Sequence, residues 1–264
     1  MLTAVKNQIK VTVLSIKYGL MREMLNKTTF VTNILFMILN NATMIIQWIV
    51  LYSLKDNIGG YSFKEIILLW GLASGTYGVA HFCFEQAFNL SEIIYNGKLD
   101  SYLVQPKNVL ISAITSQVHI SALGDIIYAY IMLFIYGITI KSFLLFTLFC
   151  ICGGLITVSL IIIFSSLSFW FNKTDFLVDT VNRLMLNFAT YPDGIFKGLS
   201  KIILYTIIPV GFANYLPVKV ISNFNPLITI AITLVTLFLI TIAFLVFYKG
   251  LKRYSSSNLM IARI

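Results

Sequence analysis

Charged residues are scarce in this chain of 264 residues, of which Asp, Glu, Lys and Arg make up only 11%. Soluble domains carry about 25% charged residues, so this shortage argues against a soluble globular protein. Cysteine and proline are also few, with three and five residues, which excludes a disulfide scaffold and a collagen-like chain. Hydrophobic residues reach 58% and the mean hydropathy is +0.89, which excludes disorder. The composition predicts an all-α integral membrane protein, because a helix crosses about 30 Å of hydrocarbon with roughly 20 apolar residues.

The motifs of several enzyme classes are missing. The sequence contains no G-x-x-x-x-G-K-[ST] loop, no H-E-x-x-H, no G-x-S-x-G and no dinucleotide-binding fingerprint. Only two histidines occur, and Cys83, Cys150 and Cys152 lie in apolar runs without the spacing of metal ligands. We therefore expect core cysteines in a chain that is not an enzyme and has no metal or cofactor of its own.

Acidic residues are in the minority, with 10 Asp and Glu against 19 Lys and Arg. In a soluble protein this excess would indicate nucleic-acid binding, but here the basic residues flank apolar segments, where they set membrane orientation. We therefore expect contact with membrane lipids and none with nucleic acid. If both termini are cytoplasmic, twelve Lys and Arg fall on the cytoplasmic side and six on the outer side, while Arg183 lies within a span. This distribution predicts cytoplasmic N- and C-termini and an even number of spans.

Residues 1–28 form the first of two predicted regions. Basic residues interrupt this region, which excludes the apolar core of a signal peptide. Its apolar residues recur at steps of three and four and so share one helical face. The pattern predicts an amphipathic helix in the cytoplasmic interface of the membrane, with a solvated N-terminal extension as the alternative. The apolar residues of this face are Val5, Ile9, Val13, Ile16, Leu20 and Met24.

Residues 29–264 form a membrane domain with six predicted transmembrane helices. Before the last helix, residues 192–225 are apolar but contain Pro192, Pro209 and Pro217. A broken apolar segment of this kind predicts re-entrant or interfacial helices, whose backbone must be covered by protein or water. The six helices are expected over about residues 30–54, 62–88, 109–138, 143–171, 176–191 and 226–248.

Residues 89–109 are the longest polar stretch between two predicted spans. Ser91 is expected to cap a short helix that Gly97 ends, and Asp100 to cap a second helical turn. Because this stretch would lie on the cytoplasmic side, it is the best candidate for a surface that docks a partner.

Several polar residues fall inside the predicted spans. Asn40 and Asn41 lie in the first helix and Asp125 in the third. An ionised side chain costs about 2.5–3.5 kcal/mol at mid-span, so each needs a partner or a water-filled cavity. Asp179 and Arg183 are four residues apart in the fifth helix and could form an ion pair instead of contacting substrate. Further candidates near helix ends are His81, Glu85 and His119.

Three short segments follow one another in a distinctive order. They are Gly97-Lys98-Leu99-Asp100 with Leu103 and Pro106; Tyr191-Pro192, Ile208-Pro209-Val210 and Leu216-Pro217; and Tyr248-Lys249-Gly250-Leu251-Lys252-Arg253-Tyr254-Ser255-Ser256. In this order, with six helices and an amphipathic start, they resemble the permease subunits of ABC-2 type ABC transporters. The resemblance covers nearly the whole chain and is strongest to the branch described as ABC-2 family transporter permeases.

The resemblance implies a subunit of an ATP-driven exporter in a bacterial plasma membrane. Two permease chains, identical or paralogous, would pair, and each would dock a cytosolic ABC ATPase that binds the ATP and Mg²⁺. Residues 91–105 would be the coupling helix, and the first and fifth membrane helices would line the seam and the translocation path. The expected substrate is a lipid, a drug or an amphiphile that resembles an antimicrobial peptide. The coupling residues would be Glu92, Gly97, Lys98 and Asp100, and the path residues Asn40, Asn41, Asp125, Asp179 and Arg183.

Three other functions stay open at the level of the sequence. A secondary transporter driven by an ion gradient could use Asp125, Glu85 or His81 as proton sites, although no internal repeat is evident in the spans. A membrane-embedded enzyme is disfavoured by the missing motifs. A membrane scaffold or an immunity-type protein would need no ATPase, so co-purification of a P-loop subunit would separate it from an exporter.

Overall fold

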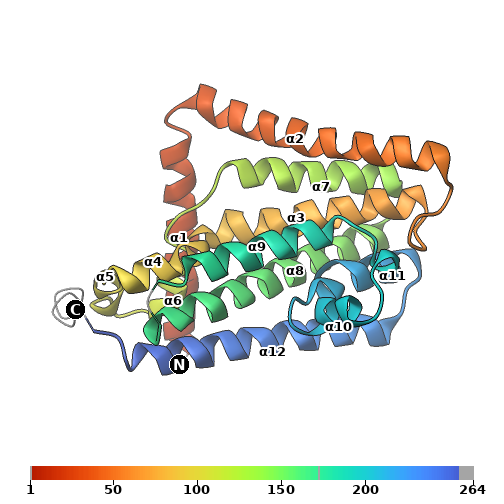
Figure 1. Ribbon diagram of the computed structural model, residues 1–264. Helices are drawn as coiled ribbons and strands as arrows, with labels where there is room; N and C mark the ends of the chain where they lie inside the picture. Colours follow the sequence, from red (N-terminus) through yellow and green to blue (C-terminus); the bar gives the residue numbers. More distant parts are fainter. Residues whose placement is uncertain (1, 172, 256–264) are drawn as a thin grey trace.

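Long apolar stretches form the longest helices in the computed structural model, which describes residues 2–171 and 173–255 (Figure 1). Within these residues, four helices are long and apolar enough to cross a membrane. A fifth crossing would come from the helix pair Leu199–Thr206 and Gly211–Ser222, if this pair, bent by 75°, counts as one span. The four helices are α2 (Lys27–Leu54), α3 (Phe63–Phe88), α8 (Ile140–Ser166) and α12 (Pro226–Leu251).

Two shorter helices, α7 (Ser121–Gly137) and α9 (Asp175–Ala189), run alongside the long ones (Figure 1). Neither meets the length criterion for a span, so the predicted count of six is not confirmed. The continuous helix predicted over residues 109–138 is wrong, because α6 (Val109–Ile114) ends well before α7 begins. The Thr115 hydroxyl donates to the Ile111 carbonyl at 2.7 Å at the end of α6. Residues 115–119, which are polar except for the buried Val118, then follow as irregular chain.

Helix α1 (Leu2–Glu23) lies crosswise to the long helices near one end of the bundle (Figure 1). Its Gln8 carboxamide oxygen accepts from the Asn108 backbone N–H at 2.9 Å, and its Ser15 hydroxyl donates to the Thr115 carbonyl at 2.9 Å. On its other side Ile9 and Val13 are exposed. The helix is therefore attached to the bundle by polar contacts, and its position in a membrane interface stays a prediction. We name the end of the bundle that holds α1 the inner end and the opposite end the outer end.

Helix α3 is the centre of the bundle, where it packs between α7 and α8. Glycines permit this close approach. A Cβ atom on Gly78 would come within 2.7 Å of the Ile126 side chain of α7, and one on Gly75 within 2.5 Å of the Cys150 sulfur of α8. Cys150 and Cys152 are buried in the core as predicted, and Cys83 is partly buried.

Helix α2 lies at the edge of the bundle beside α7 (Figure 1). It approaches α7 closely at Gly124, where a Cβ atom would come within 2.7 Å of the Ile34 carbonyl oxygen. Of all residues in α2, only Trp48 is buried. An apolar helix with so little burial requires lipid or another protein chain along most of its surface.

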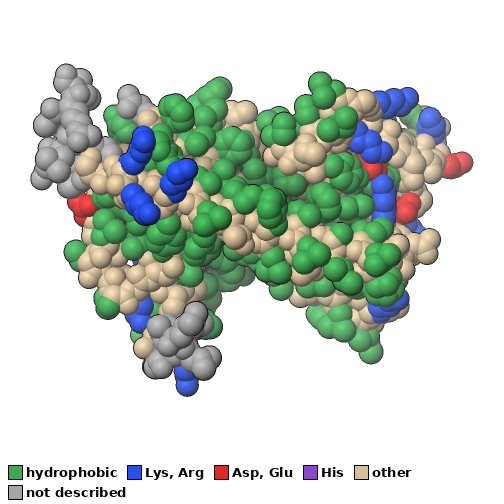
Figure 2. All heavy atoms as spheres, turned by 90° about the horizontal axis from the view of Figure 1, so that it is seen from below, with side chains coloured by type: hydrophobic (Ala, Val, Ile, Leu, Met, Phe, Trp, Pro, Cys, Tyr) green, Lys and Arg blue, Asp and Glu red, His purple; other side chains and the backbone are tan. Residues whose placement is uncertain are grey.

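The predicted broken segment forms a compact set of short helices at the outer end. These are the 3₁₀ turn η2 (Asp193–Ile195), α10 (Leu199–Thr206), the π-helical turn η3 (Gly211–Tyr215) and α11 (Leu216–Ser222). Figure 2 shows that hydrophobic side chains cover the middle of one side of the molecule, while charged side chains gather toward its two ends. This distribution suits a protein whose middle is surrounded by hydrocarbon.

Candidate functional site

The polar segment 89–109 forms two short helices at the inner end, α4 (Leu90–Tyr95) and α5 (Asp100–Leu103). Gly97 lies between them with a φ of +70°, a conformation that L-residues with a side chain rarely adopt. The prediction that Gly97 ends the first helix is therefore confirmed.

The predicted capping roles of Ser91 and Asp100 are wrong. Asn89 is the N-cap of α4, and Leu99 precedes Asp100 as the N-cap of α5. Ser91 is instead fully buried inside α4. Its hydroxyl forms hydrogen bonds with those of Ser168 at 2.7 Å and Thr174 at 3.1 Å. These contacts fix α4 to the turn between α8 and α9, so the segment is anchored to two helices of the bundle.

Two of the predicted coupling residues contact each other across the Gly97 turn. The Lys98 ammonium donates to Glu92 Oε1 at 2.8 Å, and the Asn96 side chain donates to the same oxygen at 3.1 Å. The hydrogen bond and the charge of Lys98 lower the pKa of the Glu92 carboxyl below its usual value. Asp100 is not part of this cluster, because its Oδ1 accepts from the Tyr254 hydroxyl at 2.9 Å. Asp100 thus joins α5 to the chain that leaves α12.

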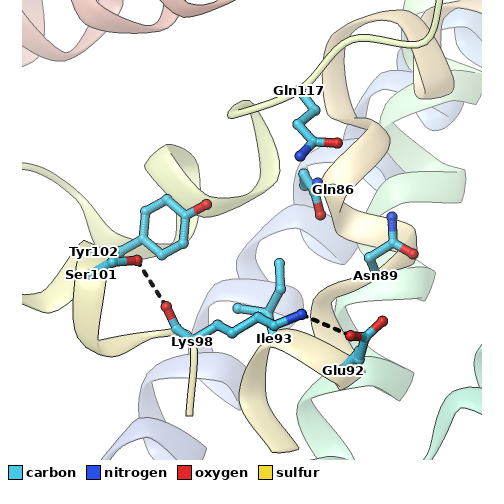
Figure 3. Close-up of a pocket in the computed structure, with 8 residues that line it drawn as sticks. All are labelled: Gln86, Asn89, Glu92, Ile93, Lys98, Ser101, Tyr102 and Gln117. Atoms are coloured by element: carbon cyan, nitrogen blue, oxygen red, sulfur yellow. Dashed lines mark hydrogen bonds and ion pairs between the residues drawn. The ribbon is translucent and has the colours of Figure 1, made fainter. Parts of the chain in front are cut away.

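Glu92 and Lys98 line a cavity of about 510 Å³ at the inner end. Figure 3 shows their ion pair along one wall of this cavity, with Gln86 and Gln117 together on another. Its lining is mainly polar, and the chain supplies both a carboxylate and an ammonium to it. Such a surface can accept side chains of a partner protein. The lining residues are Gln86, Asn89, Glu92, Ile93, Lys98, Ser101, Tyr102 and Gln117.

Inside the bundle, the structure brings together Asn41 and Asp125, two of the residues that were predicted to line a path. The Asn41 amide donates to Asp125 Oδ1 at 2.6 Å. The Ser74 hydroxyl of α3 donates to the Asp125 carbonyl at 2.8 Å. Asp125 is therefore the point at which α2, α3 and α7 share a polar contact.

The other predicted path residues lie on exposed faces. Asn40 is exposed on α2, and Asp179 and Arg183 are exposed on α9. The possible ion pair between Asp179 and Arg183 is not formed in the part of the chain that the structure describes. Both charges therefore remain available to a neighbouring chain or to water.

The two histidines of the chain lie close together near the inner half of α3. The His81 Nδ1 atom lies 2.6 Å from Glu85 Oε2, and the His81 ring stacks on Phe88 with centroids 3.9 Å apart. The His119 ring centroid is 6.2 Å from that of His81. His81 and Glu85, which the sequence places four residues apart, therefore contact each other, and His119 lies beside them.

Asp193 is a buried carboxylate at the outer end that our sequence reasoning missed. Its Oδ2 accepts from Lys219 at 2.8 Å and from the Tyr205 hydroxyl at 3.0 Å, and Lys201 lies 3.7 Å away. Burial raises the pKa of the Asp193 carboxyl, but the hydrogen bond and charge of Lys219, with the Tyr205 hydrogen bond, bring it below its usual value. The signal was present in the sequence, because Asp193 is the only acidic residue after Asp179.

Substitution of Asp193 by Asn should destabilise the outer end by roughly 1–3 kcal/mol, because the charged hydrogen bonds to Lys219 and Tyr205 are weakened. The pKa of the Asp193 carboxyl is lower in the folded protein than in the unfolded chain. The stabilisation by ionised Asp193 is therefore fully present above pH about 4. It is lost as the pH falls through the pKa of the folded protein. Thermal unfolding in detergent should show a lower midpoint for Asp193→Asn at pH 7 and a smaller difference at pH 3. The exposed Asp56→Asn is the matched control, and equal midpoints at pH 7 for all three proteins would refute the role of Asp193.

Comparison with known families identifies the chain. The family model described as ABC-2 family transporter protein matches residues 38–258, which include the inner segment, Asp125 and the outer segment. No curated protein and no solved structure matches the chain. The match covers most of the sequence and begins within α2, and the chain therefore belongs to the ABC-2 family of transporter proteins.

Proposed function

We propose that this chain is the permease of an ATP-driven exporter and works as one of two membrane subunits, each coupled to a cytosolic ATPase. Family membership supports a transporter permease and does not favour the carrier driven by an ion gradient. The chain has no P-loop motif, so ATP and Mg²⁺ would be bound by the partner ATPase. The substrate class is a lipid, a drug or a peptide-like amphiphile, and the setting is a bacterial plasma membrane with cytoplasmic termini.

The observation that carries the pairing of two permeases is a row of amides on α2. Asn33, Asn40 and Gln47 are spaced by seven residues and therefore lie on nearly the same helix face. All three side chains are exposed, and none has a hydrogen-bond partner among the described residues. In hydrocarbon such amides need hydrogen bonds across a helix interface or water. A second permease, meeting α2 along this row, supplies either an interface or a wet path.

Helix α9 also carries exposed charged side chains that favour contact with a second permease. Its exposed Asp179 and Arg183 would be costly in contact with lipid, but they can face a second chain or a water-filled path. At the outer end, the Trp48 ring of α2 and the Tyr191 ring after α9 approach with centroids 5.9 Å apart. The two helices that carry unpaired polar groups are therefore linked at one end.

The inner segment is suited to transmit force from an ATPase. Ser91 anchors α4 to the α8–α9 turn, and Asp100 anchors α5 to the chain after α12 through Tyr254. A push on α4 or α5 would therefore reach several membrane helices at once. The polar cavity with Glu92 and Lys98 offers the complementary contact for the ATPase (Figure 3).

The seam predicts a cross-link between two copies at Asn40. In a variant without the three native cysteines, Asn40→Cys should form a disulfide-linked dimer upon oxidation in membranes, measured by non-reducing electrophoresis. Leu234→Cys, an exposed apolar position of α12, should stay monomeric. Two results would contradict this contact between permeases along α2. One is equal cross-linking at Asn40→Cys and Leu234→Cys. The other is no cross-link from Asn40→Cys to any second permease chain, identical or paralogous.

Coupling predicts that Asp100→Arg separates ATP hydrolysis from transport. The reversed charge should lower transport at least tenfold while the bound ATPase still hydrolyses ATP, because the Tyr254 contact and the docking surface both change. Gly97→Trp should act in the same direction, since a side chain at a φ of +70° is strained. Asp56→Arg at the outer end is the control with the same change of charge. Normal transport by Asp100→Arg with the ATPase still bound would defeat the assignment.

A further inference from the structure

We propose, on the basis of the proposed exporter function, that Asp125 is the anionic contact for a cationic group of the transported substrate, such as an organic ammonium. Asp125 is only 4% exposed. Its Oδ1 accepts from Asn41, and Ser74 Oγ lies 3.4 Å from the same atom. Its other carboxylate oxygen, Oδ2, is buried without a hydrogen-bond partner among the described residues. The site thus has one satisfied oxygen and one free acceptor.

No Lys or Arg of the helices around Asp125 lies close enough to balance its charge. The only Lys or Arg residues of α2, α3 and α7 are Lys27 and Lys64, at the first and second positions of their helices. The imidazoles on this side are those of His81 in α3 and His119 before α7. Within the described ranges no ion pair includes Asp125. A buried carboxylate without a counter-charge is strongly unfavourable, so the geometry requires a cation or a proton there. A substrate cation satisfies this need during each transport cycle.

Side chains that favour cations continue from Asp125 toward the inner end. Ser74, Tyr77, His81 and Glu85 follow one another on α3 at steps of three and four, which places them along one face. The rings of Tyr77 and His81 have centroids 4.1 Å apart. Aromatic faces and carboxylates both attract organic cations. This ladder therefore offers several weak contacts before the buried carboxylate.

The end of the ladder at Glu85 is next to the polar cavity at the inner end. Gln86, next to Glu85 in the chain, and Gln117, two residues before His119, line that cavity and lie together in Figure 3. Arg183 and Asp179 are both exposed on α9, and Glu92 pairs with Lys98 in the cavity. The carboxylates of Glu85 and Asp125 remain along this route, so we expect it to attract a cation.

Access to Asp125 is controlled by α2. Asn41 covers the carboxylate, and Trp48 is the only fully buried residue of α2, which otherwise packs on the bundle through partly buried residues. Movement of α2 along the seam would break the Asn41 hydrogen bond and expose Asp125 to the path. The same contact would therefore hold the site closed when no cation is bound.

Two lipophilic ions of matched shape test this inference. Tetraphenylphosphonium is a cation, and tetraphenylborate is its anionic counterpart. The full-length chain, with any ATPase that co-purifies, is placed in phosphatidylcholine nanodiscs, and binding is measured by equilibrium dialysis against empty nanodiscs. The wild type should bind the phosphonium, and Asp125→Asn should weaken that binding at least tenfold without changing the borate background. Asp125→Glu should restore most of it, and Asp56→Asn should behave like the wild type.

Two results would overturn the inference. One is equal binding of the phosphonium by wild type and by an Asp125→Asn variant that melts within a few degrees of it. The other is no wild-type binding above empty nanodiscs. If either occurs while Asn40→Cys still cross-links and the ATPase still co-purifies, the cation site fails and the exporter function stands. If Asp125→Asn does not fold, Asp125→Glu decides in its place, because it keeps the carboxylate and should bind the phosphonium within a few fold of the wild type. A folded Asp125→Glu that does not bind, while Asp56→Asn binds, would contradict the site.

Discussion

The hydrocarbon of a bilayer provides no hydrogen bonds, and this constraint decides which surfaces of the chain can face lipid. Most of α12 satisfies it simply, because before Lys249 its exposed residues are apolar except Thr241, whose hydroxyl donates to the Leu237 carbonyl. Helix α3 satisfies it by burial between α7 and α8, where glycines allow close packing. Helix α2 does not satisfy it alone, since its exposed face carries a row of amides. In the proposed exporter, a second permease or the path between the two chains covers that row.

The same constraint explains why buried polar groups at the two ends of the molecule are paired with one another. At the inner end, buried hydroxyls and the Asp100–Tyr254 hydrogen bond tie a polar segment to several helices. At the outer end, Asp193 gathers Lys219, Tyr205 and Lys201 around one buried carboxylate. Between them Asp125 and Asn41 form a contact that movement of α2 would open. In the proposed exporter, force applied at the inner segment would reach the bundle through α4 and α5.

Features set by local sequence were predictable, whereas features set by tertiary contacts were not. The helices α2, α3, α8 and α12 follow from long apolar runs, and the turn at Gly97 follows from glycine chemistry. The irregular residues 115–119 were missed because the apolar residues on both sides of them suggested one continuous helix, and the break depends on polar contacts such as that between Ser15 and Thr115.

The candidate residues divide in the same way. Asp125 could be recognised as a charge inside a span, but its pairing with Asn41 depends on how α2 meets α7. Spacing permitted an ion pair between Asp179 and Arg183, yet the side chains do not form one in the described structure. Ser91 looked like a cap because of its position in the sequence, and its burial against Ser168 and Thr174 depends on residues more than 70 positions away.

The central claim is that this chain is a conduit without an energy source, which works as a pair of permeases driven by separate ATPases. Native mass spectrometry of the complex, purified from its own membrane in mild detergent, tests this most directly. The account predicts a mass that corresponds to two permease chains and two P-loop subunits. A stable single chain that moves solute after reconstitution without any ATPase would contradict it.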